Sequence, residues 1–90
     1  MPRYLIEREL PGAGSLSEDE IQAISQKSNK VLAGMAGRAQ WVQSYVTGDA
    51  ITCVYVADSP EAVRDHAAAS GFPCTTVREV GRIIDPTTAE

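Results

Sequence analysis

The two segments 41–46 and 50–57 carry apolar side chains at both alternating sets of positions. One set is small and mostly aliphatic: Val42, Ser44, Val46, Thr52, Val54 and Val56. The other set holds larger or more reactive side chains: Trp41, Gln43, Tyr45, Ile51, Cys53 and Tyr55. A strand with one face in water is apolar at alternate positions only. The pattern therefore predicts a β-hairpin with both faces covered, the second by a ligand, a partner chain or both.

The register of this hairpin depends on its turn. A three-residue loop, residues 47–49, pairs Tyr45 with Ile51 and Trp41 with Tyr55, so the two sets stay on separate faces. A two-residue turn would mix them, because a slip of one residue moves every side chain to the other face. We favour the three-residue loop because it separates the aliphatic set from the aromatic set.

Two helices are predicted on either side of the hairpin. The first begins after Ser17, an N-cap residue with Glu20 three positions on as its reciprocal partner, and Gly34 stops it. The second begins after Ser59 with a proline in its first turn, and Gly71 ends it as a left-handed cap.

Strands are predicted at both ends, over residues 3–9 and about 75–84, and the polar residues after them form a loose tail. The resulting order βαββαβ is typical of an α+β ferredoxin-like plait, with four antiparallel strands and both helices on one face. We expect a single domain over residues 1–86 and a loose C-terminal tail over 87–90.

The helices should cover the aliphatic face of the sheet, because their own stripes consist of Ile, Val, Leu and Ala. The face with Trp41, Tyr45, Cys53 and Tyr55 would then be open in a monomer, as an apolar patch that is large for a free surface. We therefore predict a homodimer that stacks two sheets as a dimeric α/β barrel, with the functional pocket between them.

Charge and composition narrow the class of protein. The net charge is −4 and the eight Lys and Arg residues are scattered, which argues against a nucleic-acid partner. No signal-type or membrane-spanning stretch is visible, so a cytoplasmic protein with no membrane partner is expected. The chain contains no CxxC, HExxH or P-loop, its two cysteines are expected to be reduced, and Gly12 to Gly14 is interpreted as a turn.

Two residues could bind a metal or react as nucleophiles. Cys53, predicted to lie opposite Gln43, is either a soft ligand or nucleophile or a small buried hydrophobe. His66, the only histidine, is either a ligand or a structural residue, and Asp65 is a poor orienting partner because adjacent helix residues do not face each other.

Two carboxylates, Glu7 and Glu79, lie on the first and last predicted strands, which are adjacent central and edge strands in this fold. On a shared face they would supply oxygen ligands or an acid and base pair. The alternative is cross-strand ion pairing with Arg8 or Arg78. The three aromatics Trp41, Tyr45 and Tyr55 are expected either to line the pocket or to pack in the dimer interface.

Several stretches together resemble a domain-of-unknown-function family of small bacterial proteins: residues 1–8, 41–46, 53–55 and 66–80. The resemblance covers the chain from Pro2 to about Glu90. It implies a ferredoxin-like fold, a dimer formed through the sheets and, as in the family's nickel-binding member, a metal held by imidazoles and a thiol. Cys53 and His66 match two of those positions, and Glu7 and Gln43 stand where histidines are expected.

These observations lead to three functional hypotheses for the open sheet face. The first is a small protein that binds nickel, another divalent transition metal or a small ligand. Its metal ligands would be Glu7, Gln43, Cys53 and His66, and its ligand-binding residues Trp41, Tyr45, Tyr55 and Glu79. The second is an enzyme of the monooxygenase or isomerase type, and the third is a structural interaction module.

Overall fold

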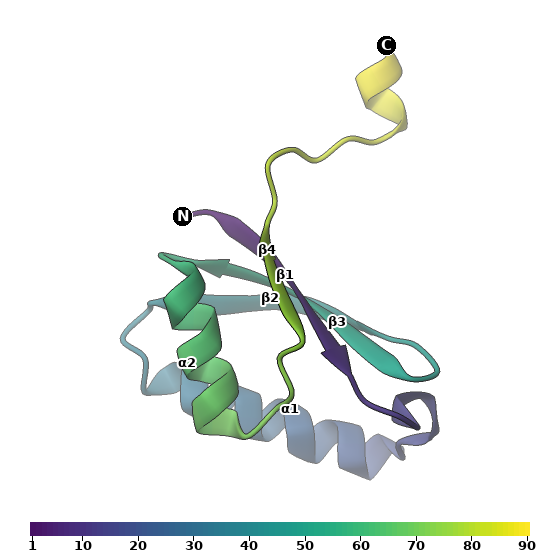
Figure 1. Cartoon of the computed structure of the whole chain (residues 1–90), viewed down its shortest axis with the longest axis vertical. Coiled ribbons are helices and arrows are strands. Elements are labelled where there is room, and N and C mark those ends of the chain that lie inside the picture. Colours follow the sequence, from purple (N-terminus) through teal and green to yellow (C-terminus); the bar gives the residue numbers. More distant parts are fainter.

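The computed structural model describes residues 1–90 and has the ferredoxin-like α+β fold (Figure 1). Its antiparallel sheet has the order β2-β3-β1-β4. The strands are β1 (Arg3–Glu9), β2 (Ala39–Val46), β3 (Ala50–Ala57) and β4 (Thr76–Glu79). The helices are α1 (Glu18–Ala33) and α2 (Pro60–Ser70), with short 3-10 turns η1 (Ala13–Ser15) and η2 (Pro86–Ala89). No helix is long and apolar enough to span a membrane.

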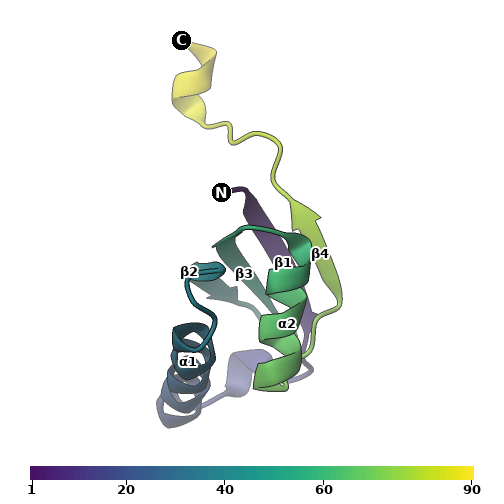
Figure 2. The same cartoon turned by 90° about the vertical axis from the view of Figure 1, so that its left-hand side faces the viewer.

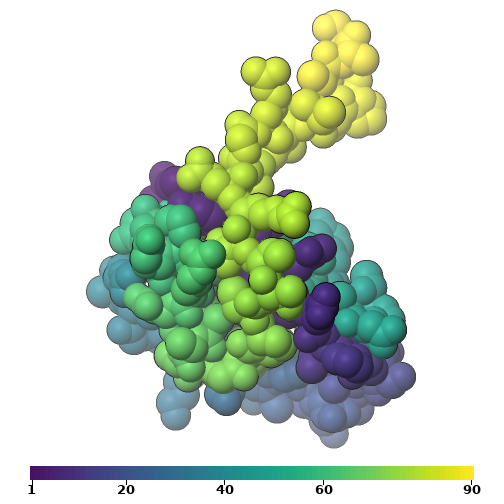
Figure 3. Space-filling model, in the orientation of Figure 1, coloured from purple at the N-terminus to yellow at the C-terminus, as the bar shows by residue number.

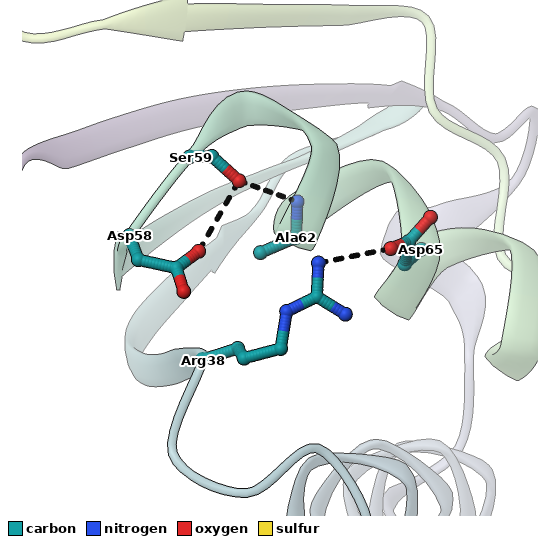
Figure 4. Close-up of polar contacts among 5 residues, drawn as sticks. All are labelled: Arg38, Asp58, Ser59, Ala62 and Asp65. Atoms are coloured by element: carbon teal, nitrogen blue, oxygen red, sulfur yellow. Dashed lines mark hydrogen bonds and ion pairs between the residues drawn. The ribbon is translucent and has the colours of Figure 1, made fainter.

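Both helices begin and end where the local signals predicted. Ser17 Oγ accepts from the Glu20 backbone N–H at 3.1 Å, and Glu20 Oε1 accepts from the Ser17 N–H at 3.0 Å. At the start of α2, Ser59 Oγ accepts from the Ala62 N–H at 3.2 Å (Figure 4). Gly71 ends α2 with φ of 74°, the left-handed conformation that glycine adopts without strain.

An ion pair on the solvent-exposed side of α2 shows how this helix is turned. Arg38, just before β2, donates from Nη2 to Asp65 Oδ2 at 3.0 Å (Figure 4). Asp65 therefore points away from the sheet, and the next residue, His66, is fully buried. The expectation that Asp65 does not orient His66 is confirmed.

The hairpin follows two registers, one in each half. Near the turn Tyr45 pairs with Thr52, and the Thr47 N–H donates to the Ala50 carbonyl at 2.9 Å, so the predicted three-residue loop is wrong. A β-bulge between Trp41 and Gln43 then shifts the register. Beyond it Trp41 pairs with Tyr55, as predicted, because a bulge places one extra residue in β2.

The assignment of the two sheet faces was also wrong. The core beneath the helices contains Tyr4, Ile6, Cys53 and Tyr55, whereas Tyr45 is 56% exposed on the other face. The reason is that the side chains of α2 and those of the sheet face beneath it are complementary in size. The buried residues of α2 are mostly small, so large sheet side chains are needed to fill the space to native density.

The C-terminal end of the chain leaves the sheet earlier than predicted. β4 stops at Glu79, and residues 81–90 are all exposed on an arm that projects from the domain (Figures 1 and 3). Ile83 and Ile84 are on this arm and are 66% and 70% exposed. The predicted strand up to residue 84 is therefore too long, because these positions have no neighbouring strand to pair with.

The glycines of residues 12–14 form a turn that contacts the hairpin. The Gly14 N–H donates to the Gly48 carbonyl at 3.0 Å, which joins η1 to the hairpin turn. A Cβ at Gly14 would lie 3.1 Å from Gly48 Cα, closer than most side chains tolerate. The interpretation of this segment as a turn is confirmed.

Candidate functional site

A cavity of about 170 Å³ lies between the sheet and α1. It exists because α1 packs chiefly against α2 and stands off the strands; Figure 2 shows the two helices side by side. Most of its lining is apolar, with Ile21, Ile24, Trp41, Val46, Ile51 and Phe72 among the walls. Concave apolar cavities with a few convergent polar groups are the usual form of small-molecule sites.

Small polar residues on α1 help to keep this space open. Ser25 and Ser28 lie in the middle of the helix face that lines the cavity. Ser25 Oγ donates back to the Ile21 carbonyl at 2.9 Å, which satisfies its hydroxyl within the helix. A larger apolar residue at either position would fill part of the cavity.

Arg8 is the most unusual group in the cavity wall. It continues the inward stripe of Tyr4 and Ile6 on β1, because every second strand residue points to the same face. Only 4% of Arg8 is exposed. Nε donates to Cys53 Sγ at 3.4 Å, and Nη1 donates to the Pro73 carbonyl at 2.6 Å.

The charge of Arg8 has no internal counter-ion. The ion pair of this structure joins Arg38 to Asp65, both on the exterior. Arg8 Nη2 is buried with no hydrogen-bond partner, and the guanidinium carbon lies 5.7 Å from the centroid of the Phe72 ring. Burying a charge without a counter-ion costs free energy. The rest of the fold must therefore offset the cost of burying the Arg8 guanidinium.

His66 lies next to this cluster and is completely buried. Its Nε2 is 3.1 Å from Ser28 Oγ, its ring centroid is 5.2 Å from that of Tyr55, and Nδ1 has no partner. Burial lowers the pKa of His66 below its usual value, and the positive charge of Arg8 lowers it further. The imidazole is therefore neutral at neutral pH.

Hydroxyl groups complete the polar part of the lining. Burial raises the pKa of Tyr55 above its ordinary value, so its phenol stays protonated. Trp41 Nε1 donates to Ser44 Oγ at 2.9 Å, so the indole N–H is satisfied at the cavity rim. The cavity thus combines one unpaired cation with neutral hydroxyl groups and apolar walls.

The four predicted metal ligands are not brought together. Cys53 and His66 are buried on the helix side of the sheet, whereas Glu7 and Gln43 lie on the opposite, outer face. Glu7 accepts from Thr76 Oγ1 at 3.3 Å, and the Gln43 amide bonds to the Tyr45 hydroxyl. No group of three or more His, Cys, Asp or Glu side chains in the chain could hold a metal ion.

The predicted ligand-binding residues are likewise divided. Trp41 and Tyr55 line the cavity, but on the helix side of the sheet and not on the open face. Tyr45 is on the outer face, and Glu79 accepts from the Tyr4 hydroxyl at 3.5 Å on a part of the sheet that does not line the cavity. Glu79 and Glu7 point to opposite faces, so they do not form an acid and base pair.

From the sequence, Arg8 is expected only as an ion-pair partner of a glutamate. The signal that could have identified it is the alternation of Tyr4, Ile6 and Arg8, which places a cation at the end of an inward apolar stripe. The inward-facing positions of the paired strand β3, by contrast, offer Ile51, Cys53 and Tyr55, and none is acidic. Ser28 and Phe72 were not predicted as site residues either, because they come close only through the packing of α1 and α2.

The fold and the cavity define a small α+β plait protein with an internal pocket between its sheet and a helix. The chain belongs to the nickel responsive protein SCO4226-like family, whose family model matches residues 4–80. This confirms the family resemblance found in the sequence.

One solved structure supports the same fold. The crystal structure of SCO4226 from Streptomyces coelicolor A3(2) has a TM-score of 0.77 to this chain at 16% sequence identity. The match covers 91% of this chain and 99% of that chain. The search of curated proteins found no match.

The name of the family raises the question of whether the residues of this chain fit a nickel ion. Cys53 on β3 and His66 on α2 are the buried thiol and the buried imidazole on the inner side of the sheet, and Arg8 donates a hydrogen bond to the Cys53 sulfur. A guanidinium at that sulfur opposes the approach of a divalent cation. The inner donor set of this chain therefore does not fit nickel.

Proposed function

We propose that this protein binds a small, mainly apolar molecule in the cavity between its sheet and α1. The observation that carries the proposal is the cavity itself, at a place where a helix of this fold would be expected to pack directly on the strands. Nine of its 14 lining residues are hydrophobic, and its polar groups converge from β1, β3 and α1. That combination favours a binding site over a packing defect.

Trp41 makes the proposal testable without a label. It is the only tryptophan in the chain and it lines the cavity, so its fluorescence reports on occupancy. We expect small aromatic or aliphatic probes to shift the Trp41 emission saturably and to raise the melting temperature of the protein.

A variant that fills the cavity provides the decisive comparison. Ser25→Leu places an isobutyl group in the cavity and is expected to abolish probe binding while keeping the fold. Gln26→Leu is the matched control, because Gln26 is the exposed neighbour on the same helix. Equal probe binding by the two variants would refute the assignment of the site to this cavity.

The outer face of the sheet supports a second proposal, that two copies of the chain pair through it. Leu5 on β1 and Val42 and Tyr45 on β2 are between 40% and 56% exposed, which is a high exposure for large apolar side chains of one sheet. Glu7 and Arg78 lie beside Leu5. A two-fold axis can place the acidic group of one copy opposite the basic group of the other.

A further inference from the structure

We propose that the molecule bound in the cavity is a small organic acid, with its carboxylate held by Arg8 and an apolar body against the surrounding walls. This proposal rests on the proposed function of the cavity and adds to it the chemical class of the ligand. It also accounts for the poor fit to nickel, because the same guanidinium that opposes a cation would recognise an anion.

The geometry of Arg8 leaves part of its guanidinium without a partner. More than nine tenths of this side chain is buried, it lines the cavity, and its Nη2 has no hydrogen-bond partner. Its contacts with Cys53, the Pro73 carbonyl and the Phe72 ring orient the guanidinium without neutralising it. The Arg8 guanidinium is therefore held in place, and its Nη2 is left to bind a ligand.

No carboxylate in the chain pairs with Arg8 to neutralise its charge. An arginine side chain does not deprotonate in proteins. Burial keeps Tyr55 protonated and His66 is neutral, so neither offers a counter-ion. The ligand that complements this site is an anion.

A carboxylate fits this site better than a phosphate does. A phosphate carries more charge and more acceptors than one guanidinium and a few hydroxyls can satisfy, whereas a carboxylate matches the planar arginine fork with a single charge. The remaining walls are apolar and favour an aliphatic or aromatic body. Tyr55 and Ser28 supply hydroxyls that can donate to the second carboxylate oxygen.

The experiment compares charged probes with neutral probes of the same shape. Phenylacetate and hexanoate are titrated against phenylacetamide and hexanamide, with Trp41 fluorescence and calorimetry as readouts. We expect wild type to bind the acids more tightly than the amides. In Arg8→Met the acids should bind about 10- to 100-fold more weakly, because a hydrogen bond to a charged group is lost, while the amides change little.

Two further variants keep the result interpretable. Arg78→Met removes an arginine from the outer face and should bind the acids as wild type does. Arg8→Lys retains the charge without the fork and should bind acids with intermediate affinity; it also replaces Arg8→Met should that variant not fold. Inorganic phosphate and nickel chloride serve as competing probes and should not displace phenylacetate.

The outcomes separate this proposal from the one on which it rests. Should amides and acids bind equally well, or acid binding survive in Arg8→Met and Arg8→Lys unchanged, the cavity binds small molecules but the assignment to organic acids is wrong. Should none of the four organic probes bind, both proposals fail. Displacement of phenylacetate by phosphate would also overturn the carboxylate assignment.

Discussion

His66 is the residue whose burial links the stability of the fold to pH. In the folded protein the pKa of His66 is lowered, by burial first and by the charge of Arg8 second. In the unfolded chain its pKa is about 6.5. Below that pH the unfolded state binds a proton that the folded state does not. The contribution of neutral His66 is therefore complete above about pH 6.5 and is lost as the pH falls toward the lowered value.

We expect the melting temperature of the wild type to fall as the pH is lowered from about 7.5 to 5. The charged and polar groups near the ring, Arg8, Ser28 and Tyr55, offer no acid that could stabilise the imidazolium. His66→Gln removes the titrating group and should flatten this part of the curve. A variant curve as steep as that of the wild type would assign the pH dependence to other groups.

Cys53 allows a direct test of the nickel question. Because Arg8 donates to its sulfur, we expect Cys53→Ala to take up nickel to the same extent as wild type, measured by calorimetry on protein without a histidine tag. Cys74→Ala is the matched control, since Cys74 is the other free thiol. Loss of uptake in Cys53→Ala alone would contradict the conclusion that this donor set does not fit nickel.

At the scale of single residues, the sequence identified Cys53, His66, Trp41 and Tyr55 as groups worth examining. It could not show that they share a buried cluster with Arg8, because that depends on which sheet face the helices cover. The sequence predicts that the aliphatic stripes of the helices cover the aliphatic face of the sheet. Packing instead matched the small residues of α2 with the large residues of β1 and β3.

Among the elements, α1 forms the helical wall of the cavity, and its N-cap should contribute to the stability of that wall. Ser17→Ala removes the acceptor for the Glu20 N–H and is expected to lower the free energy of unfolding by about 1 kcal/mol. Urea denaturation measures this change. Ser15→Ala, at an exposed position in η1, should have a much smaller effect.

The helix ends were predictable because their signals are local. Ser17 with Glu20, Ser59 and Gly71 act within one turn of their own helix. The hairpin register was not predictable, because the bulge in β2 carries no sequence signal of its own. The end of β4 was missed for a related reason: residues after Val80 are apolar enough for a strand but have no partner strand.

For the whole molecule, the outer sheet face should decide the oligomeric state. Leu5→Asp introduces a charge at the centre of this face, and we expect it to convert a dimer into a monomer in light scattering coupled to size-exclusion chromatography. Ile84→Asp, on the exposed arm, is the control and should leave the mass unchanged. A wild-type mass of one chain at micromolar concentration would refute the pairing.

The bulge in β2 explains how a tryptophan and a serine three positions apart come to share one side of a strand. In a regular strand Trp41 and Ser44 would point in opposite directions, yet the indole N–H of Trp41 reaches the Ser44 hydroxyl. The extra residue is Val42, which is 47% exposed. Deleting it would leave Trp41 opposite Tyr55 in a straight ladder. One residue can therefore be inserted or deleted at this point of β2 while Trp41 keeps facing the cavity.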